Sequence, residues 1–213
     1  MEHIGDILKN YHPGTDIPSS HQTRDLTSSL SKPEQLAGSL GVTTLENTFE
    51  NFKPVSGTES ALAAFKAVLD GPEFMLLCYG GVGNGKTHLC EAVAIELYKR
   101  GKFCRVMKMP DMLATLRKAI NNPEMGYDEI LGNFCYGERL IVDDVGAGGS
   151  DSEFGDRVLE TIVVARYGRQ LLTIMTTNVE ISQLPERVIS RFEDTVTSYL
   201  VQNEGEDYRR LRR

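Results

Sequence analysis

Several absences limit what this chain can be. It has no apolar run of the roughly 18 residues that cross a bilayer, and no basic-then-apolar export signal at its N-terminus. Its four cysteines lie far apart without a C-x-x-C pair, so neither a zinc site nor a disulfide framework is indicated. It also lacks a basic excess, since the net charge is −7, which argues against a surface built for tight, non-specific nucleic-acid binding. We therefore expect a cytoplasmic protein without membrane contact, whose cysteines are core thiols.

The chain does contain enough apolar residues for one folded core. With 213 residues, 40% of them hydrophobic, it can bury one α/β domain, which we expect over residues 46–203. Residues 1–45 are expected to form a short helix with one apolar face, at 4–11, and a flexible linker rich in Ser, Thr, Asp and Pro. That helix either binds a partner or folds back on the domain. The basic tail, 204–213, either contacts phosphates or is solvated.

One short segment is the most informative about function. Residues 80–87 fit the pattern G-x-x-x-x-G-K-[ST]. An apolar run at 74–79 precedes it and predicts a buried strand, and a helical pattern at 87–100 follows it. Strand, glycine loop and helix in this order are the context in which the pattern binds a nucleoside triphosphate. A plain glycine-rich turn before a helix is the alternative.

The residue types of this loop suit a chain of phosphates. Its glycines let the backbone wrap a phosphate, so that amide N–H groups point at the phosphate oxygens, and the helix start adds partial positive charge. Lys86 supplies a mobile cation for the β- and γ-phosphates of ATP, and the Thr87 hydroxyl is an oxygen ligand suited to Mg²⁺. The predicted nucleotide-binding residues are Gly80, Gly81, Val82, Gly83, Asn84, Gly85, Lys86, Thr87 and His88.

Strands and helices alternate through the rest of the domain. The predicted strands are 74–79, 103–109, 139–145, 171–176 and 195–201, and the predicted helices are 58–69, 87–100, 111–120, 127–136 and one that ends at Gly168. This alternation predicts an α/β fold in which a parallel five-stranded sheet is covered by helices on both faces, a three-layer sandwich. In such folds the nucleotide binds at the carboxyl ends of the strands.

Two carboxylates end the 139–145 strand. Hydrolysis needs a carboxylate that holds the metal and a group that orients the attacking water. We assign Asp143, with Thr87, to the magnesium ion, and Asp144 to the water. The alternative is a pair of carboxylates that simply ends a strand and caps the next helix.

Two further polar residues follow the next strand. The 171–176 strand leads to Asn178, whose amide is placed to sense the γ-phosphate or to hold the water. Arg191 lies one helical turn after Arg187 on a short predicted helix, where an arginine can reach the nucleotide of a neighbouring subunit. The alternative for Arg191 is a surface arginine paired with a neighbouring glutamate.

Five motifs in one order give the chain a family resemblance. They are T-F-E-N-F at 48–52, G-G-V-G-N-G-K-T-H-L at 80–89, L-I-V-D-D-V-G at 140–146, T-T-N at 176–178 and E-R-V-I-S-R-F at 186–192. In this order they resemble the DnaC/DnaI-type helicase loaders, a clade of AAA+ ATPases close to DnaA and IstB. The resemblance implies catalytic roles for Lys86 and Asp144, a first-sensor role for Asn178 and a finger role for Arg191. It also implies that Phe49 and Phe52 lie near the adenine.

The same resemblance implies a function. We expect a slow, assembly-stimulated ATPase that uses ATP and Mg²⁺, forms an ATP-dependent homo-oligomer and delivers a hexameric replicative helicase onto single-stranded DNA. Binding of single-stranded DNA is expected to be weak in the monomer. The two predicted helices before Asp143, at 111–120 and 127–136, offer Arg117 and Lys118, and several acidic side chains lie beside them in the sequence. An IstB-like helper of a transposase is the alternative. A small-molecule kinase and an adaptor that hardly hydrolyses ATP represent other classes.

Two departures from the family pattern carry their own expectations. Many AAA+ proteins place Glu where this chain has Asp144, so turnover is expected to be slow. The chain also ends soon after the last predicted strand, so no helical lid is expected, and Arg209 is the candidate for a second sensor.

Overall fold

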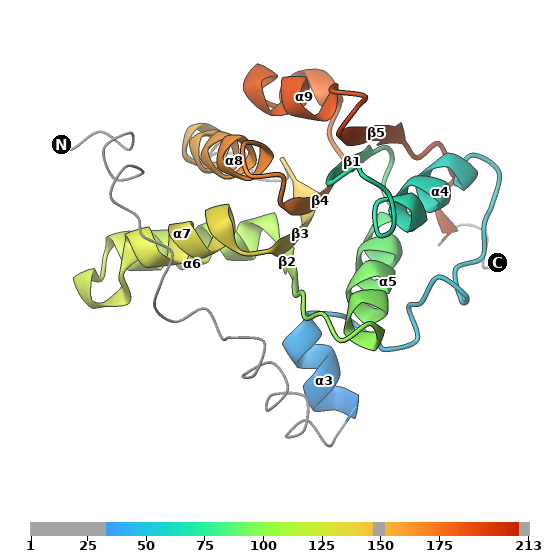
Figure 1. Cartoon of the computed structure of the whole chain (residues 1–213), viewed down its shortest axis with the longest axis horizontal. Helices are drawn as coiled ribbons and strands as arrows, with labels where there is room; N and C mark the ends of the chain where they lie inside the picture. The colour runs from blue at the N-terminus through green and yellow to red at the C-terminus, as the bar shows by residue number, and fades with distance from the viewer. Residues whose placement is uncertain (1–32, 147–151, 209–213) are drawn as a thin grey trace.

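A five-stranded parallel sheet forms the centre of the computed structural model, which describes residues 33–146 and 152–208 (Figure 1). The strand order is β2-β3-β4-β1-β5, and every neighbouring pair is parallel. The strands are β1 (Met75–Tyr79), β2 (Val106–Lys108), β3 (Arg139–Val145), β4 (Leu172–Thr177) and β5 (Ser198–Gln202). Because all strands run the same way, their carboxyl ends meet at one edge.

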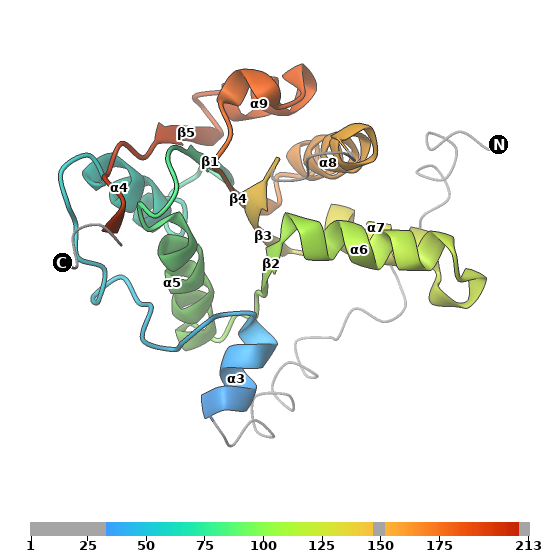
Figure 2. The same cartoon turned by 180° about the vertical axis from the view of Figure 1, so that it is seen from behind.

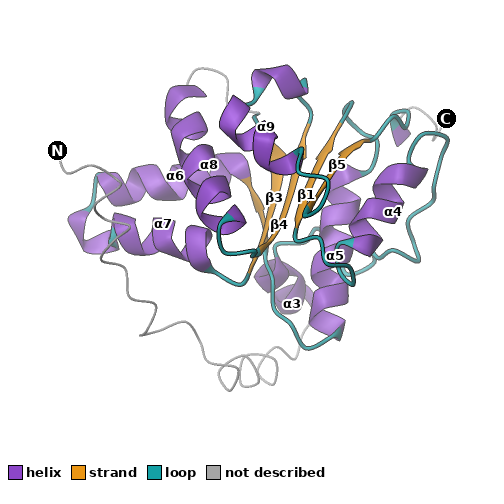
Figure 3. Ribbon diagram, turned by 45° about the horizontal axis from the view of Figure 1, so that its top comes forward, coloured by secondary structure: helices purple, strands orange, loops and turns teal. Residues whose placement is uncertain are grey.

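Helices cover both faces of the sheet, as Figures 1 and 2 show from opposite sides. One face carries α3 (Pro33–Leu40), α4 (Glu59–Ala67) and α5 (Lys86–Lys99). The other carries α6 (Met109–Ile120), α7 (Tyr127–Tyr136), α8 (Ser152–Tyr167) and α9 (Glu186–Phe192). Two short 3₁₀ helices, η1 (Pro123–Met125) and η3 (Ile181–Gln183), lie in connections. Figure 3 shows the strands between the two groups of helices.

Strand β1, which lies between β4 and β5, has an apolar run at residues 75–78 because both of its faces are buried. Leu76 and Cys78 belong to the core under α4 and α5, whereas Met75 and Leu77 belong to the core under the helices of the opposite face. A strand covered on both faces therefore shows a continuous apolar run instead of an alternating pattern. The predicted α/β three-layer sandwich with a parallel five-stranded sheet is confirmed.

The N-terminal boundary differs from the expected one. Residues 1–45 are expected to hold a short helix and a flexible linker, but α3 within this range packs on the core: Leu40 is fully buried, and Leu36 and Ala37 lie against the same cluster. The reason is that three apolar residues on a helix of eight are enough to cover one end of a core, although they are too few to give a clear periodic pattern. The helix predicted at 4–11 lies outside the described residues.

The C-terminal boundary also differs. Residues from 204 onward were expected to form a tail, but the described part of it lies against the domain. The Glu204 amide donates to the Gly57 carbonyl, and the Tyr208 amide donates to the Gly83 carbonyl, each over 3.0 Å. Arg209 lies outside the described residues, so its role as a second sensor stays a prediction.

All four cysteines are buried and free. They lie in the two cores, as expected from their scattered positions. Among the described residues, no helix is both long and apolar enough to cross a membrane.

Candidate nucleotide site

The glycine loop connects β1 to α5 and turns sharply at three glycines. Gly80, Gly83 and Gly85 have φ of 142°, 76° and 91°, values that side-chain-bearing residues rarely adopt. Close packing adds a second constraint at Gly85, where a Cβ would lie 2.7 Å from the ring of Phe52. The loop therefore needs glycine at these positions for conformation as well as for room.

The ammonium of Lys86 lies inside this loop. It donates to the carbonyls of Gly80 (2.8 Å) and Gly81 (2.7 Å) and to Oδ1 of Asn84 (3.0 Å). The side chain is nearly buried, and burial lowers the pKa of Lys86. The loop thus holds a cation where the pattern places the phosphates.

Asp143, at the end of β3, joins the loop to the sheet. Its Oδ2 accepts a hydrogen bond from the Thr87 hydroxyl (2.8 Å), and its Oδ1 accepts one from the Thr176 hydroxyl on β4. Hydroxyl and carboxylate oxygens are ligands that Mg²⁺ prefers. The described residues contain no group of three or more His, Cys, Asp or Glu that suits a metal ion. The pair fits Mg²⁺ nevertheless, because this ion usually takes one or two protein oxygens together with phosphate oxygens and water.

Asp144 and Asn178 meet at the same edge. The Asn178 amide donates to Oδ1 of Asp144 over 2.5 Å, and the Asp144 backbone amide donates to the Thr176 hydroxyl over 3.2 Å. Asp144 has a φ of 64°, in the left-handed region, where Asp and Asn are enriched several-fold among residues other than glycine. This backbone gives a physical reason for Asp at a position where many AAA+ proteins have Glu.

A cavity of about 400 Å³ collects these groups. Its lining consists of Val82, Gly83, Asn84, Gly85, Lys86, Thr87, Lys108, Asp143, Asp144 and Asn178. The structure therefore brings the loop, both aspartates and Asn178 into one place, as the parallel topology predicts. Lys108 was missed. The signal available for it was its position at the end of β2, where its register partner is Asp143.

A second cavity, of about 810 Å³, adjoins the loop and shares Gly83 and Gly85 with the first. Phe52, His88 and Tyr208 line it, and the ring of Phe52 lies 5.2 Å from that of His88 and 6.0 Å from that of Tyr208, edge to face. Aromatic edges and faces of this kind suit a flat base. Tyr208 was not identified from the sequence.

Phe49 has different surroundings from Phe52. It packs against the core under α4, with the Lys66 ammonium 5.8 Å from its ring centre, and it does not line the larger cavity. Of the two phenylalanines expected near the adenine, only Phe52 lies beside the loop.

Arg191 does not line the phosphate cavity. Its guanidinium lies over the ring of Tyr167, 5.1 Å from the ring centre, and Tyr167 donates its hydroxyl hydrogen to Asp194 over 2.6 Å. The hydrogen bond to Asp194 raises the pKa of Tyr167, and hydrogen bonds from Tyr167 and Thr197 lower the pKa of Asp194. Arg191 therefore stacks on an aromatic ring. Within the described part of the chain it forms no ion pair with a neighbouring glutamate.

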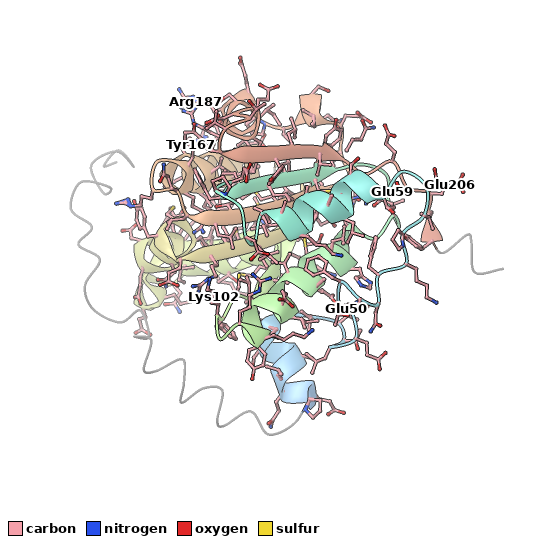
Figure 4. All side chains as sticks on the ribbon, turned by 45° about the vertical axis from the view of Figure 1, so that its right-hand side comes forward. Glu50, Glu59, Lys102, Tyr167, Arg187 and Glu206 are labelled. Carbon is pink, nitrogen blue, oxygen red and sulfur yellow. The ribbon has the colours of Figure 1, made fainter. Side chains whose placement is uncertain are left out.

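Figure 4 shows where a residue of α9 lies relative to residues near the C-terminal segment. Arg187, on the same helix as Arg191, and Tyr167 lie on one side of the molecule, whereas Glu59 and Glu206 lie on the other. Glu206 is two residues before Tyr208, which lines the larger cavity. Arg191 lines neither of the two cavities beside the loop.

Residues 44–198 match the family model of the bacterial DnaA ATPase domain. The chain belongs to this family. The chain is also similar to the replicative helicase loader DnaC of Escherichia coli (strain K12), with 26% identity over 152 residues, which are 68% of this chain and 62% of DnaC. The resemblance to DnaC/DnaI-type AAA+ proteins is confirmed. The chain spans less than two thirds of the length of DnaC.

Solved structures agree with this DnaA-family assignment. A crystal structure of the DnaC helicase loader matches with a TM-score of 0.61 and 22% identity, over 75% of this chain and 97% of that one. A replication initiator DnaA bound to AMPPCP and single-stranded DNA matches with a TM-score of 0.65 and 24% identity, over 76% of this chain and 50% of that one. These likenesses establish the AAA+ fold. In the described residues after β5, no separate lid domain follows.

Proposed function

We propose that this DnaA-family ATPase domain is an ATP-dependent loader that delivers a hexameric replicative helicase onto single-stranded DNA. The observation that carries the proposal is the single cavity in which Lys86, Thr87, Asp143, Asp144 and Asn178 meet. This is the set of groups that ATP hydrolysis requires. It occurs in a chain whose relatives include a replicative helicase loader.

The chemistry is divided among these groups. The loop amides and Lys86 hold the phosphates, and Thr87 with Asp143 holds Mg²⁺, which neutralises charge on the phosphate oxygens when bound. Asp144, oriented by the amide of Asn178, positions the attacking water. The base of the nucleotide lies in the larger cavity, beside the rings of Phe52 and Tyr208.

The position of Arg191 supports action between subunits. The ring on which it stacks, Tyr167, lies away from Glu206 in Figure 4. Arg191 does not line the phosphate cavity of the same chain. In a head-to-tail homo-oligomer, the arginine of one copy completes the site of the next. Assembly then stimulates hydrolysis, because the positive charge arrives only with the neighbour.

The relatives and the surface support the proposed partners. The relatives reported above are replication proteins, which favours a helicase over a transposase as the partner. The α6–α7 hairpin offers little positive charge for DNA, since Arg117 lies over the ring of Phe154, 5.0 Å from its centre, and Lys118 is exposed. Single-stranded DNA is therefore bound weakly by one copy and more tightly by an assembly.

A binding titration tests the nucleotide site. Wild-type protein is expected to bind Mg-ATP, and Lys86→Ala is expected to lose at least about 100-fold in affinity, roughly 2.7 kcal/mol. Lys99→Ala is the matched control, because Lys99 is an exposed lysine at the other end of the same helix. Equal affinity in wild type and Lys86→Ala would overturn the assignment of the loop.

A further inference from the structure

Two buried asparagines, 119 residues apart, join the phosphate loop to the segment after β5. The side-chain amide of Asn84 donates to the backbone carbonyl of Asn203 over 2.8 Å, and the side-chain amide of Asn203 donates to the backbone carbonyl of Asn84 over 3.0 Å. Their exposed fractions are 0% and 1%. Each asparagine thus satisfies a backbone group of the other in a place that water does not reach.

The strand register creates this pair. β5 lies beside β1 with Gln202 opposite Tyr79, so Asn203 comes next to the first residue of the loop. The backbone N–H of Asn203 donates to the Tyr79 carbonyl over 2.7 Å. A Cβ on Gly80 would lie only 2.2 Å from the backbone carbonyl oxygen of Asn203. Gly80 is therefore required for the loop to approach the segment after β5 so closely.

The side-chain oxygen of Asn84 faces the ammonium of Lys86. Its Oδ1 accepts a hydrogen bond from the Lys86 ammonium over 3.0 Å, while its Nδ2 points at the Asn203 carbonyl. Turning the amide over would place oxygen against oxygen on one side and NH₂ against the ammonium on the other. One orientation alone satisfies both neighbours, so Asn203 fixes which atom of Asn84 meets Lys86.

Asn203 is itself held in place. Its Oδ1 accepts a hydrogen bond from the backbone N–H of Gly205 over 3.1 Å. Five residues after Asn203, the backbone N–H of Tyr208 donates to the Gly83 carbonyl of the loop. Tyr208 also donates its hydroxyl hydrogen to the Lys53 carbonyl. The segment 203–208 therefore lies along the loop and is bonded to it at both ends.

We propose that Asn203 is a positioning residue of the nucleotide site, which acts through Asn84 to hold Lys86 and the loop in the geometry that receives the phosphates. The inference deepens the proposed ATP-binding function and rests on it. Nothing in the loop motif itself points to Asn203, which enters the site only through the pairing of β5 with β1.

The test measures the dissociation constant for Mg-ATP of Asn203→Ala at a temperature well below its melting midpoint. We expect it to rise about tenfold, the equivalent of about 1.4 kcal/mol. Gln202→Ala is the control, since Gln202 directly precedes Asn203, also carries a side-chain amide and is exposed. Its Oε1 accepts a hydrogen bond from the Tyr79 hydroxyl over 3.4 Å. Its dissociation constant is expected to stay within twofold of wild type.

A double-mutant cycle separates positioning from general support of the fold. Asn84→Ala is expected to cost about as much affinity as Asn203→Ala, and the double variant no more than the larger single loss, because both substitutions break one linkage. If the two losses add, or if Asn203→Ala lowers only the melting temperature and leaves the dissociation constant unchanged, the positioning role is wrong. Should Asn203→Ala not fold, Asn203→Ser is measured in its place. If wild type itself does not bind Mg-ATP, the proposed function fails, which is a different outcome.

Discussion

The amide of Asn178 donates a hydrogen bond to the carboxylate of Asp144 over 2.5 Å, joining the ends of two neighbouring strands. Asp144→Asn keeps the shape of the side chain, suits the left-handed backbone and removes only the charge. We expect the rate of ATP turnover to fall about 100-fold, the usual size of a general-base contribution, while affinity for Mg-ATP stays within twofold. Steady-state phosphate release, with a separate binding titration, measures both.

Asp128→Asn is the control for this change, because Asp128 is an exposed aspartate on α7. It removes the same charge away from the cavity. Unchanged turnover in Asp144→Asn would remove Asp144 from the mechanism.

Arg191→Ala tests whether subunits complete one another's sites. We expect nucleotide binding to be retained and assembly-stimulated hydrolysis to fall about 10³-fold. Arg187→Ala, one turn earlier and exposed, is the matched control and is expected to retain most of the stimulation. Mixing Arg191→Ala with Lys86→Ala should restore part of the turnover, because one variant supplies the loop and the other the arginine. A mixture that assembles but stays inactive speaks against action between subunits.

Arg166, near the end of α8, is a fully buried cation that holds this helix to the sheet. The side chain is fully buried and donates to the Thr173 hydroxyl over 2.7 Å, to the carbonyls of Phe134 and Gly137 over 2.8 Å each, and to the carbonyl of Leu172 over 2.7 Å. Burial lowers the pKa of Arg166 to about 10, so it stays charged at neutral pH.

Replacing this arginine leaves several acceptors without a donor. We expect Arg166→Met to lower the free energy of unfolding by about 3 kcal/mol, since each unsatisfied buried group costs about 1–3 kcal/mol and the site partly relaxes. Urea titration measures the free energy of unfolding. Arg169→Met is the control, because Arg169 is an exposed arginine that lies over the Tyr136 ring. A loss below about 1 kcal/mol would mean that water or neighbouring groups satisfy these carbonyls.

The four cysteines give a prediction about pH. Burial raises the pKa of Cys78 and Cys104 to about 12 and that of Cys135 to about 11, and it raises the pKa of Cys90 well above its usual value. Because only the thiolate reacts, the folded protein should consume almost no Ellman's reagent near neutral pH, and all four thiols should react in denaturant. Rapid reaction of a thiol in the folded protein would show that one of these sites opens readily.

Much of the site was predictable because its parts are local motifs joined by a simple topology. The loop from Gly80 to Thr87 and the end of β3 at Asp143 are contiguous patterns, and a parallel sheet brings strand ends together. The contacts of Asn203 and Tyr208 were not predictable in this way. They depend on the register of β5 beside β1 and on a close approach at Gly80, neither of which leaves a periodic signal in the sequence.

The partner of Arg191 was missed for a similar reason. Sequence neighbours suggested a glutamate, but Tyr167 lies at the end of α8, and packing of α8 against α9 brings it under the guanidinium. An aromatic ring attracts a guanidinium through its electron-rich face and, unlike a carboxylate, leaves the positive charge unneutralised.

The central claim is most directly tested by helicase delivery to a closed circle of single-stranded DNA. The hexameric replicative helicase of the organism in which this chain acts is incubated with the circle, Mg-ATP and this chain. The helicase bound to the DNA is counted after free protein is removed. We predict that wild type and Lys99→Ala raise the bound helicase several-fold and that Lys86→Ala does not. Equal amounts of bound helicase with and without the wild-type chain would contradict the account.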